Sequence, residues 1–460
     1  MIKKIKKYVR LFVSKVKVKH LTSWVLLSCL LAMIILSIFM FKQYDSPSTK
    51  EEPVAKTKIR FLSDWGNNGL KGTVITHVFK EYMDENPNID IINESIQGEA
   101  FYIKLQTDIA SGYSPDIISS KPGKNFESLF LNKKIANITE DIEKDDTWYG
   151  TMDKSLLKYV SNNKQVYGVP TDCEYISLFI NTDLFMQYNV PIPKDYEGLK
   201  TAVTIFKNNG IVPFAFSLDD SELMLYQAFV ATIGGSINLE KAINGNKLDD
   251  SYITAFSYMK ELYNMGAFPS DYETYTHNMA LDLFLDKKAA MIAQSSDMLE
   301  ELEYRNQNQN QNYSSVTMKS INDMNIDIIA FPSINNGSTH PTIAYGPGAS
   351  TYFVTTEAYE NKHDETLKLL KYITSPKTSL EFLNNAKTFV TIKTKVPPVL
   401  DKLTTDRSVV LTTAGEITLI PQNIVKDIVW QSVIKERFQD IMTGTVDERQ
   451  VWNEALSMFE

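Results

Sequence analysis

The residue types that usually carry catalysis are present in this chain, but their spacing fits no catalytic motif. The histidines, His20, His77, His277, His340 and His363, make no metal-binding pair such as HExxH. No G-x-S-x-G nucleophile elbow and no phosphate-binding P-loop occurs. Two carboxylates about 5–10 Å apart could hydrolyse a glycoside, but distances are not readable from a sequence. The sequence therefore favours a binding protein without metal or cofactor over an enzyme.

Two polar loops are candidates for binding because each follows a predicted strand. "SDWGNN" (63–68) comes after an apolar run, and "SSKPGKN" (119–125) begins where "DIISS" ends. The residues between these loops alternate between strand-like runs and apolar residues at helical spacing, which predicts β-α-β-α-β and a parallel α/β sheet. Ligands of such sheets lie beyond the carboxyl ends of the strands. Both loops should therefore lie at one edge of the sheet.

The N-terminal segment predicts a membrane anchor. Residues 1–20 hold eight Lys and Arg residues and no acid, and residues 21–41 carry no charge. About 20 apolar residues suffice to cross a bilayer, and a basic flank stays in the cytoplasm. We expect a basic cytoplasmic segment (1–20), a single transmembrane helix (21–41), a polar linker (42–57) and an extracytoplasmic globular part at the cell membrane. A cleaved signal peptide and a lipoprotein signal ending at Cys29 are the alternatives.

Composition excludes several classes of partner for the exported part. Its 39 basic residues stand against 56 acidic ones, a net charge of −17, so nucleic-acid binding is not expected. Cys173 has no second cysteine there, which excludes a disulfide framework. About 400 exported residues suggest two lobes at roughly 100–200 residues each.

The order of the segments resembles the family 1 extracellular solute-binding proteins, the sugar-binding receptors of bacterial ABC importers. The resemblance covers residues 58–460. It rests on these segments in order: "FKEYMDENPNIDI", "KLQTDIASGYSPDII", "VYGVPTDCEYISLFINTDLFMQYNVPIPKDYEGL", "FLDKKAAMIAQSS" and "FPSINNG…YGPGASTYFVTT". It implies a two-lobed periplasmic-binding-protein-like α/β fold with a hinge and a ligand between the lobes. By the family's layout, lobe one would hold 58–173 and 326–348, and lobe two 178–320 and 352–460.

The resemblance also implies ligand-binding residues. A sugar needs carboxylates or amides for its hydroxyls and aromatic rings for its apolar faces. Trp65 and Glu174 stand where the family contacts its ligand, with packing and a solvated hinge position as their alternatives. Asp116 is expected to be structural. The further candidates, each with a purely structural alternative, are Ser119, Asp220, Asp297, Gly348 and Trp430.

The expected function is that of a monomeric, membrane-tethered receptor. It would bind a carbohydrate, in this family usually an oligosaccharide, and deliver it to the permease subunits of an ABC importer. A surface glycan-processing hydrolase and a ligand-sensing receptor coupled to a membrane sensor are the alternatives. Reducing sugar released from a glycan would identify the hydrolase.

We predict that Cys29 carries no lipid, because twelve mostly apolar residues continue past it where a lipoprotein would turn polar. Cys29→Ser should leave the protein in the membrane fraction, with its mass changed only by the substitution. Radiolabelled palmitate that enters the wild type and is lost in Cys29→Ser would contradict this prediction.

Overall fold

The chain divides into two units, Met1–Lys56 and Thr57–Glu460, which are described separately. Among the described residues, no helix combines the length and apolar composition needed to cross a bilayer. Within the predicted anchor, 31–36 are helical. Cys29, Asp220 and most of the predicted linker lie outside the described residues. The computed structural model describes residues 31–36, 56–66, 69–96, 99–218, 223–244, 249–307, 325–334, 342–393, 402–425 and 427–459.

The first lobe is built on a sheet with the strand order β2-β1-β3-β12-β6. The predicted β-α-β-α-β unit is confirmed, because β1, β2 and β3 run parallel and α3 and α4 connect them. The bounds are β1 Thr57–Ser63, α3 Leu70–Glu85, β2 Ile89–Ser95, α4 Glu99–Ser111, β3 Ile117–Ser119, β6 Gly168–Pro170 and β12 Thr351–Val354.

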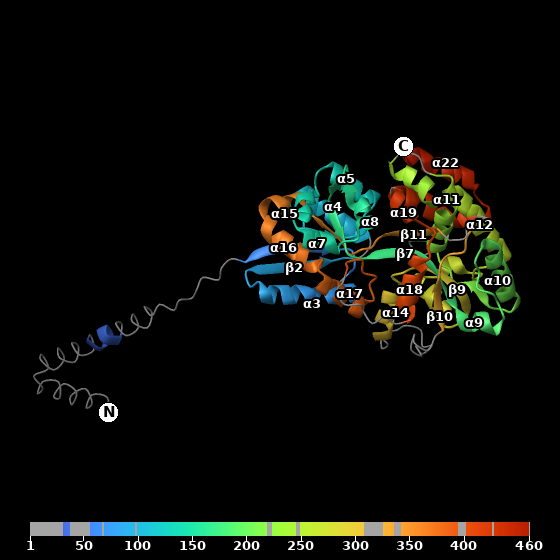
Figure 1. Cartoon of the computed structure of the whole chain (residues 1–460), viewed down its shortest axis with the longest axis horizontal. Helices are drawn as coiled ribbons and strands as arrows, with labels where there is room; N and C mark the ends of the chain where they lie inside the picture. The colour runs from blue at the N-terminus through green and yellow to red at the C-terminus, as the bar shows by residue number, and fades with distance from the viewer. Residues whose placement is uncertain are drawn as a thin grey trace, which may run out of the picture. The chain divides into compact units, whose positions relative to one another are not determined.

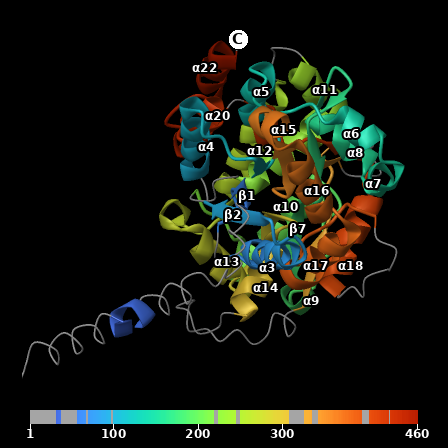
Figure 2. The ribbon, with the colours of Figure 1, turned by 90° about the vertical axis from the view of Figure 1, so that its left-hand side faces the viewer.

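Helices from two distant stretches of the chain cover this sheet. Figures 1 and 2 show α16 and α17 close to α3, and Phe79 of α3 shares one hydrophobic cluster with Leu370 and Phe382. Ser375 caps α17 by accepting from the Thr378 N–H. The remaining elements of this lobe are α5 Lys124–Leu131, α6 Thr139–Glu143, α7 Asp146–Thr151, α8 Lys154–Leu157, η1 Lys158–Val160, β4 Ser161–Asn162, β5 Gln165–Val166, α15 Thr356–Asn361, α16 His363–Ile373 and α17 Pro376–Ala386.

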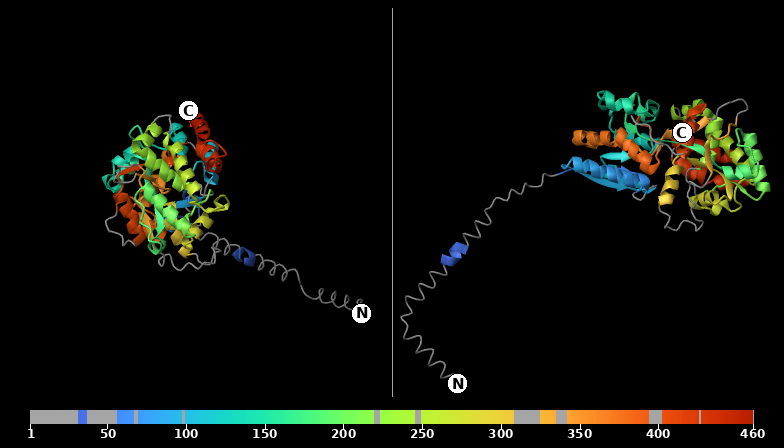
Figure 3. Two further views of the ribbon diagram at one scale, coloured as in Figure 1. Left: turned by 90° about the vertical axis from the view of Figure 1, so that its right-hand side faces the viewer. Right: turned by 60° about the horizontal axis from the view of Figure 1, so that its bottom comes forward.

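The second lobe has its own sheet, in the order β13-β11-β7-β9-β8, and β10 also pairs with β7. The left view of Figure 3 faces this lobe, with its helices over the sheet. Its strands are β7 Cys173–Asn181, β8 Val212–Phe214, β9 Ala289–Ser295, β10 Ile326–Ile329, β11 Thr342–Pro347 and β13 Glu416–Thr418. Its helices are α9 Thr182–Gln187, α10 Tyr196–Asn208, α11 Met224–Asn244, α12 Ser251–Met265, η2 Tyr272–Thr274, α13 His277–Leu285, α14 Met298–Gln307, α18 Lys402–Thr412, α19 Pro421–Ile424, α20 Asp427–Val429, the π-helix Trp430–Lys435, α21 Phe438–Thr443 and α22 Glu448–Phe459.

Three neighbouring segments connect the two lobes. The chain passes from β6 to β7 through Asp172 and from β11 to β12 through Gly348. The Gly348 N–H donates to the Asp172 carbonyl oxygen at 3.1 Å. A third segment joins them at Val390, which forms an isolated bridge with Asp172. We call these three segments the hinge.

The predicted assignment of two segments to the lobes is wrong. β10 and β11, the two strands within 326–348, pair with β7 and belong to the second lobe. β12 pairs with β3 and β6, so it and the helices α15–α17 within 352–460 belong to the first lobe. Apolar runs show that a strand exists, but strand pairing decides the sheet to which it belongs.

Asp116 has a structural role, and we predict that Asp116→Ala destabilises the fold. Its carboxylate accepts from the Arg60 backbone N–H at 2.7 Å and pairs with Lys362 at 3.0 Å. The variant leaves a buried N–H unpaired and should lose about 1–3 kcal/mol of unfolding free energy in urea titrations. The control Asp84→Ala breaks an exposed pair with Lys80 and should cost below about 0.5 kcal/mol. Equal losses in both variants would contradict this account.

Candidate functional site

Polar side chains from both lobes converge where the two sheets end beside the hinge. In the first lobe, Asp64 follows β1 and Lys121 follows β3. In the second lobe, β9 ends at Ser295 and β7 begins beside it, since Ile176 pairs with Ser295. The carboxyl ends of parallel strands are the usual binding edge of an α/β sheet.

A buried lysine in the first lobe contacts carboxylates of the second lobe and of the hinge. Lys71 lies in the first turn of α3 and is 4% exposed. Its Nζ lies 3.1 Å from Asp172 Oδ2, 3.5 Å from Asp297 Oδ2 and 3.5 Å from Glu300 Oε2. Burial alone would lower the pKa of Lys71, but the three carboxylates raise it well above its usual range. We call Lys71, Asp172, Asp297 and Glu300 the Lys71 cluster.

Glu300 also caps a helix of the opposite lobe. The N-cap residue of α3, Gly69, offers no side-chain cap, and the Lys71 backbone N–H donates to Glu300 Oε1 at 3.1 Å. A carboxylate at a helix N-terminus interacts favourably with the helix dipole. Burial raises the pKa of Glu300 to about 7, against the opposing charge of Lys71. One residue of α14 therefore makes two contacts that depend on the lobes being together.

A second ion pair joins the lobes at Glu174. Lys121 Nζ lies 2.8 Å from Glu174 Oε2, and the Glu174 side chain is 2% exposed. Ser295 Oγ lies 3.4 Å from the same Glu174 oxygen and accepts from the Asp297 N–H at 3.3 Å. The predicted residues Glu174 and Asp297 are thus brought together through Ser295.

One carboxylate oxygen of Asp64 finds no hydrogen-bond partner in the part of the chain that the structure describes. Its Oδ2 accepts from Ser120 Oγ at 2.6 Å, whereas Oδ1 is buried and has no partner among the described residues. Burial raises the pKa of this carboxyl to about 6. A buried acceptor without a donor costs about 1–3 kcal/mol, so a hydrogen-bond donor placed at this oxygen would be stabilising.

The aromatic candidates lie in the cores of the two lobes. Trp65 is 6% exposed, packs against Phe382 and donates from Nε1 to the Ala349 carbonyl oxygen at 3.0 Å. Trp430 is fully buried beside Tyr226. Both rings therefore have packing roles, and their contact with a ligand stays a prediction.

Ser119 and Gly348 also have structural contacts. Ser119 Oγ donates to the Ala349 carbonyl oxygen at 2.8 Å. A Cβ on Gly348 would lie 2.6 Å from Asp172 Oδ1, so the hinge requires glycine there for space. Their contact with a ligand also stays a prediction.

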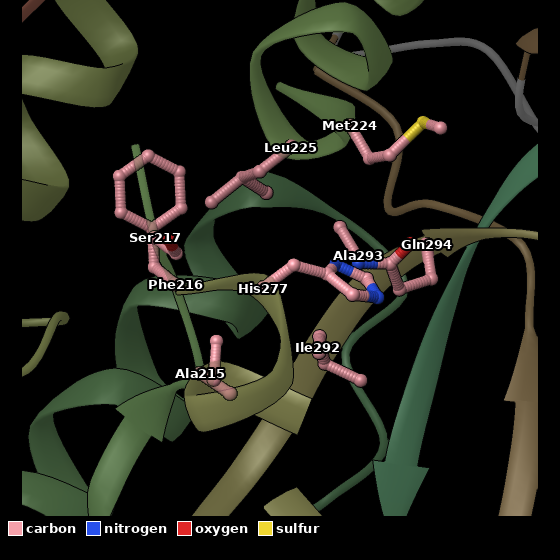
Figure 4. Close-up of a pocket in the computed structure, with 10 residues that line it drawn as sticks. Ala215, Phe216, Ser217, Met224, Leu225, His277, Ile292, Ala293 and Gln294 are labelled. Atoms are coloured by element: carbon pink, nitrogen blue, oxygen red, sulfur yellow. The ribbon is translucent and has the colours of Figure 1, made fainter. Parts of the chain in front are cut away.

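A pocket in the second lobe adjoins these groups (Figure 4). It lies beyond the end of β8 and beside residues Ile292–Gln294 of β9. Gln294 precedes Ser295, which contacts Glu174. His277, Ser217 and Gln294 are its polar groups. The lining is Ala215, Phe216, Ser217, Met224, Leu225, His277, Ala280, Ile292, Ala293 and Gln294. Most of the lining is apolar, and in this structure the cavity of about 10 Å³ has room for roughly one water molecule.

Sequence reasoning missed Lys71, Glu300, Asp64 and His277 as site residues. Lys71 had one signal, since a lysine in the first turn of a helix is unfavourable for the helix dipole and needs a compensating partner. No comparable signal marked Glu300, because an acid on a polar helix is usually solvated. Within the described residues, no three His, Cys, Asp or Glu side chains are arranged to hold a metal ion.

Several solved structures share this fold. One comes from work on xylan utilization by Caldanaerobius polysaccharolyticus; it is 20% identical, has a TM-score of 0.74, and the match covers 88% of this chain and 100% of that one. A chitin oligosaccharide binding protein is 16% identical with a TM-score of 0.72 over 87% and 98% of the two chains. A Bacillus licheniformis sugar transporter solved with stachyose is 16% identical with a TM-score of 0.67 over 87% and 99%.

The family follows from a direct sequence match. No curated protein is significantly similar to the chain in sequence. The model of the bacterial extracellular solute-binding proteins matches residues 77–408, more than half of the chain. This is a family of binding proteins, in agreement with the expectation that the chain is not an enzyme. With its two α/β lobes, its hinge and this match, the chain belongs to the bacterial extracellular solute-binding proteins.

Proposed function

We propose that this protein binds an oligosaccharide between its lobes and delivers it to the permease subunits of an ABC importer. The similar structures include a chitin oligosaccharide binding protein and a sugar transporter in complex with stachyose. The observation that carries the proposal is the convergence of hydrogen-bonding groups from both lobes and the hinge at the Lys71 cluster. Carboxylates at such a place suit the hydroxyls of a sugar.

A neutral polyol would fit the site because its hydroxyl groups donate hydrogen bonds to the carboxylates without adding a charge. A ligand hydroxyl would pair with the buried Oδ1 of Asp64, and others would reach Glu174 and Gln294. The apolar wall formed by Phe216, Leu225 and Ile292 would take the C–H face of a sugar ring.

The ligand would favour closure of the lobes. A ligand that contacts both lobes only in the closed form shifts the equilibrium toward that form. In this structure the contacts of Lys71 with Asp297 and Glu300 join the lobes. The ligand would therefore add to contacts that the protein makes by itself.

We also propose that residues 21–41 tether the protein to the cell membrane, with the lobes outside. The proposal rests on the uncharged 21-residue stretch after the basic segment 1–20 and on the extracellular location of the family. The polar linker would leave the lobes free to reach a neighbouring permease.

We predict that an oligosaccharide stabilises the protein against heat. At 100 times its Kd, a ligand adds about 2.7 kcal/mol to the unfolding free energy. Full-length protein in detergent should show a raised Tm with at least one of raffinose, stachyose, xylotetraose and chitotetraose. The matched controls are their monosaccharides, which fill less of the site. A Tm that no sugar changes would contradict the proposal.

We predict that sugar binding is weaker at high pH because of Glu300. Burial raises its pKa to about 7 in the closed arrangement, whereas a solvated Glu has a pKa of about 4.3. Closure therefore takes up a proton between these values, and deprotonation above pH 7 opposes it. Kd should rise about tenfold between pH 6 and pH 8 from this group alone.

Calorimetry of variants separates Glu300 from other titrating groups. Glu300→Gln keeps an oxygen for the α3 cap but cannot ionise. The Kd of this variant for the sugar should therefore lack the tenfold rise between pH 6 and pH 8. Glu303→Gln, on the same helix and bonded to Gln307, should keep the wild-type pH profile. The same profile in Glu300→Gln and wild type would rule out this role.

A further inference from the structure

The second-lobe pocket contains a histidine bonded to a network of charged side chains, in which Arg305 is fully buried and the others are partly exposed. His277 is the first residue of α13, and its Nε2 lies 2.9 Å from Glu301 Oε2. Figure 4 shows the His277 imidazole beside Ala293 and Gln294 of the pocket wall. A carboxylate only accepts hydrogen bonds, so this contact places a hydrogen on Nε2.

The carboxylate that orients His277 is itself fixed by an arginine. Glu301 Oε1 accepts from Arg305 Nε at 3.1 Å and from Nη2 at 2.9 Å. The Arg305 side chain is 1% exposed. Burial alone would raise the pKa of Glu301, but its contacts with His277 and Arg305 lower it. Glu301 therefore stays ionised and remains an acceptor for His277.

Arg305 also donates hydrogen bonds to α13, the helix that begins at His277. Its Nη1 donates to Asp282 Oδ1 at 2.7 Å and its Nη2 to Asn278 Oδ1 at 2.6 Å. Both partners lie on α13, while Arg305 lies on α14. The guanidinium thus bonds to the first and second turns of α13 and to the carboxylate that orients His277. Buried polar groups with satisfied hydrogen bonds hold one geometry rather than several.

The same helix connects this pocket to the other lobe. Glu300 and Glu301 are neighbours on α14, and consecutive helical residues point about 100° apart. Glu300 contacts Lys71 of the first lobe, while Glu301 contacts His277 in the pocket. The orientation of α14 therefore affects the pocket and the contact between the lobes together.

We infer that His277 is a specificity-determining residue for the sugar, and that Arg305 is a positioning residue that acts on it through Glu301. This inference rests on the proposed function. An imidazole fixed by a carboxylate presents one hydrogen-bonding geometry, so it distinguishes a hydroxyl placed to meet it from one in the epimeric position. A site built to bond a hydroxyl discriminates strongly because the unmatched group is left unpaired.

The first test measures binding by calorimetry on the full-length protein, with stachyose, xylotetraose and chitotetraose as probes. His277→Ala should weaken the best probe about 5- to 150-fold, the loss for one unpaired hydroxyl, and reduce the ratio of affinities between the probes. The control Met279→Ala changes an exposed side chain in the same turn and should leave Kd and the ratio unchanged.

The second test reads the orientation of His277 without a ligand. Nitrogen-15 NMR shifts of histidine-labelled protein should show the Nε2–H form of His277 in the wild type. Glu301→Gln and Arg305→Lys should both shift this signal, whereas Glu303→Gln should not. Circular dichroism confirms that each variant is folded.

The outcomes separate this inference from the proposed function. If none of the sugars binds the wild type, the proposed function fails and the role of His277 fails with it. If a sugar binds and His277→Ala binds it with unchanged affinity and ratio, the inference about His277 alone is overturned. If the His277 signal is the same in Arg305→Lys and wild type, the positioning role of Arg305 is overturned.

Discussion

The arrangement of the two lobes and the hinge depends on the contacts of the buried ammonium group of Lys71. Taking a cation out of water is costly unless it is paired, and three carboxylates surround this one. Asp172 belongs to the hinge, while Asp297 and Glu300 belong to the second lobe. Removing one partner from a buried ion pair costs about 3–5 kcal/mol, so the lobes and the hinge depend on each other at this point.

The position of Asp172 explains how the hinge and the site are connected. Its carbonyl oxygen accepts from Gly348, its Oδ1 accepts from the Ser350 N–H at 2.9 Å, and its Oδ2 pairs with Lys71. Two of the hinge segments and the first lobe thus meet at one side chain. A hinge motion changes the dihedral angles of a few such residues, so movement of the lobes must change contacts at the binding edge. Under the proposed function, the strength of binding and the degree of closure would depend on the same contacts.

The sequence predicted the first lobe's parallel unit because its apolar periodicity and turn residues act locally. The helix of Phe79 and Tyr82 and its end before Pro87 are set by neighbouring residues. The assignment of β11 and β12 to lobes failed because pairing between distant strands leaves no local pattern. The ionic contacts of Lys71 were missed for the same reason. The burial of Trp65 shows that an aromatic residue after a strand fits a core and a pocket equally well, and only the neighbouring rings distinguish these cases.

A sugar bound between the lobes should close them, and an interlobe distance tests this closure most directly. Spin labels at Lys368→Cys on α16 and Thr201→Cys on α10 would mark the two lobes at exposed positions. Cys29→Ser avoids labelling at that site, while Cys173 is buried. We predict that a bound oligosaccharide shortens and narrows the distribution of distances between the two labels, measured by pulsed electron spin resonance. A distribution that stays the same while calorimetry shows full occupancy would contradict it.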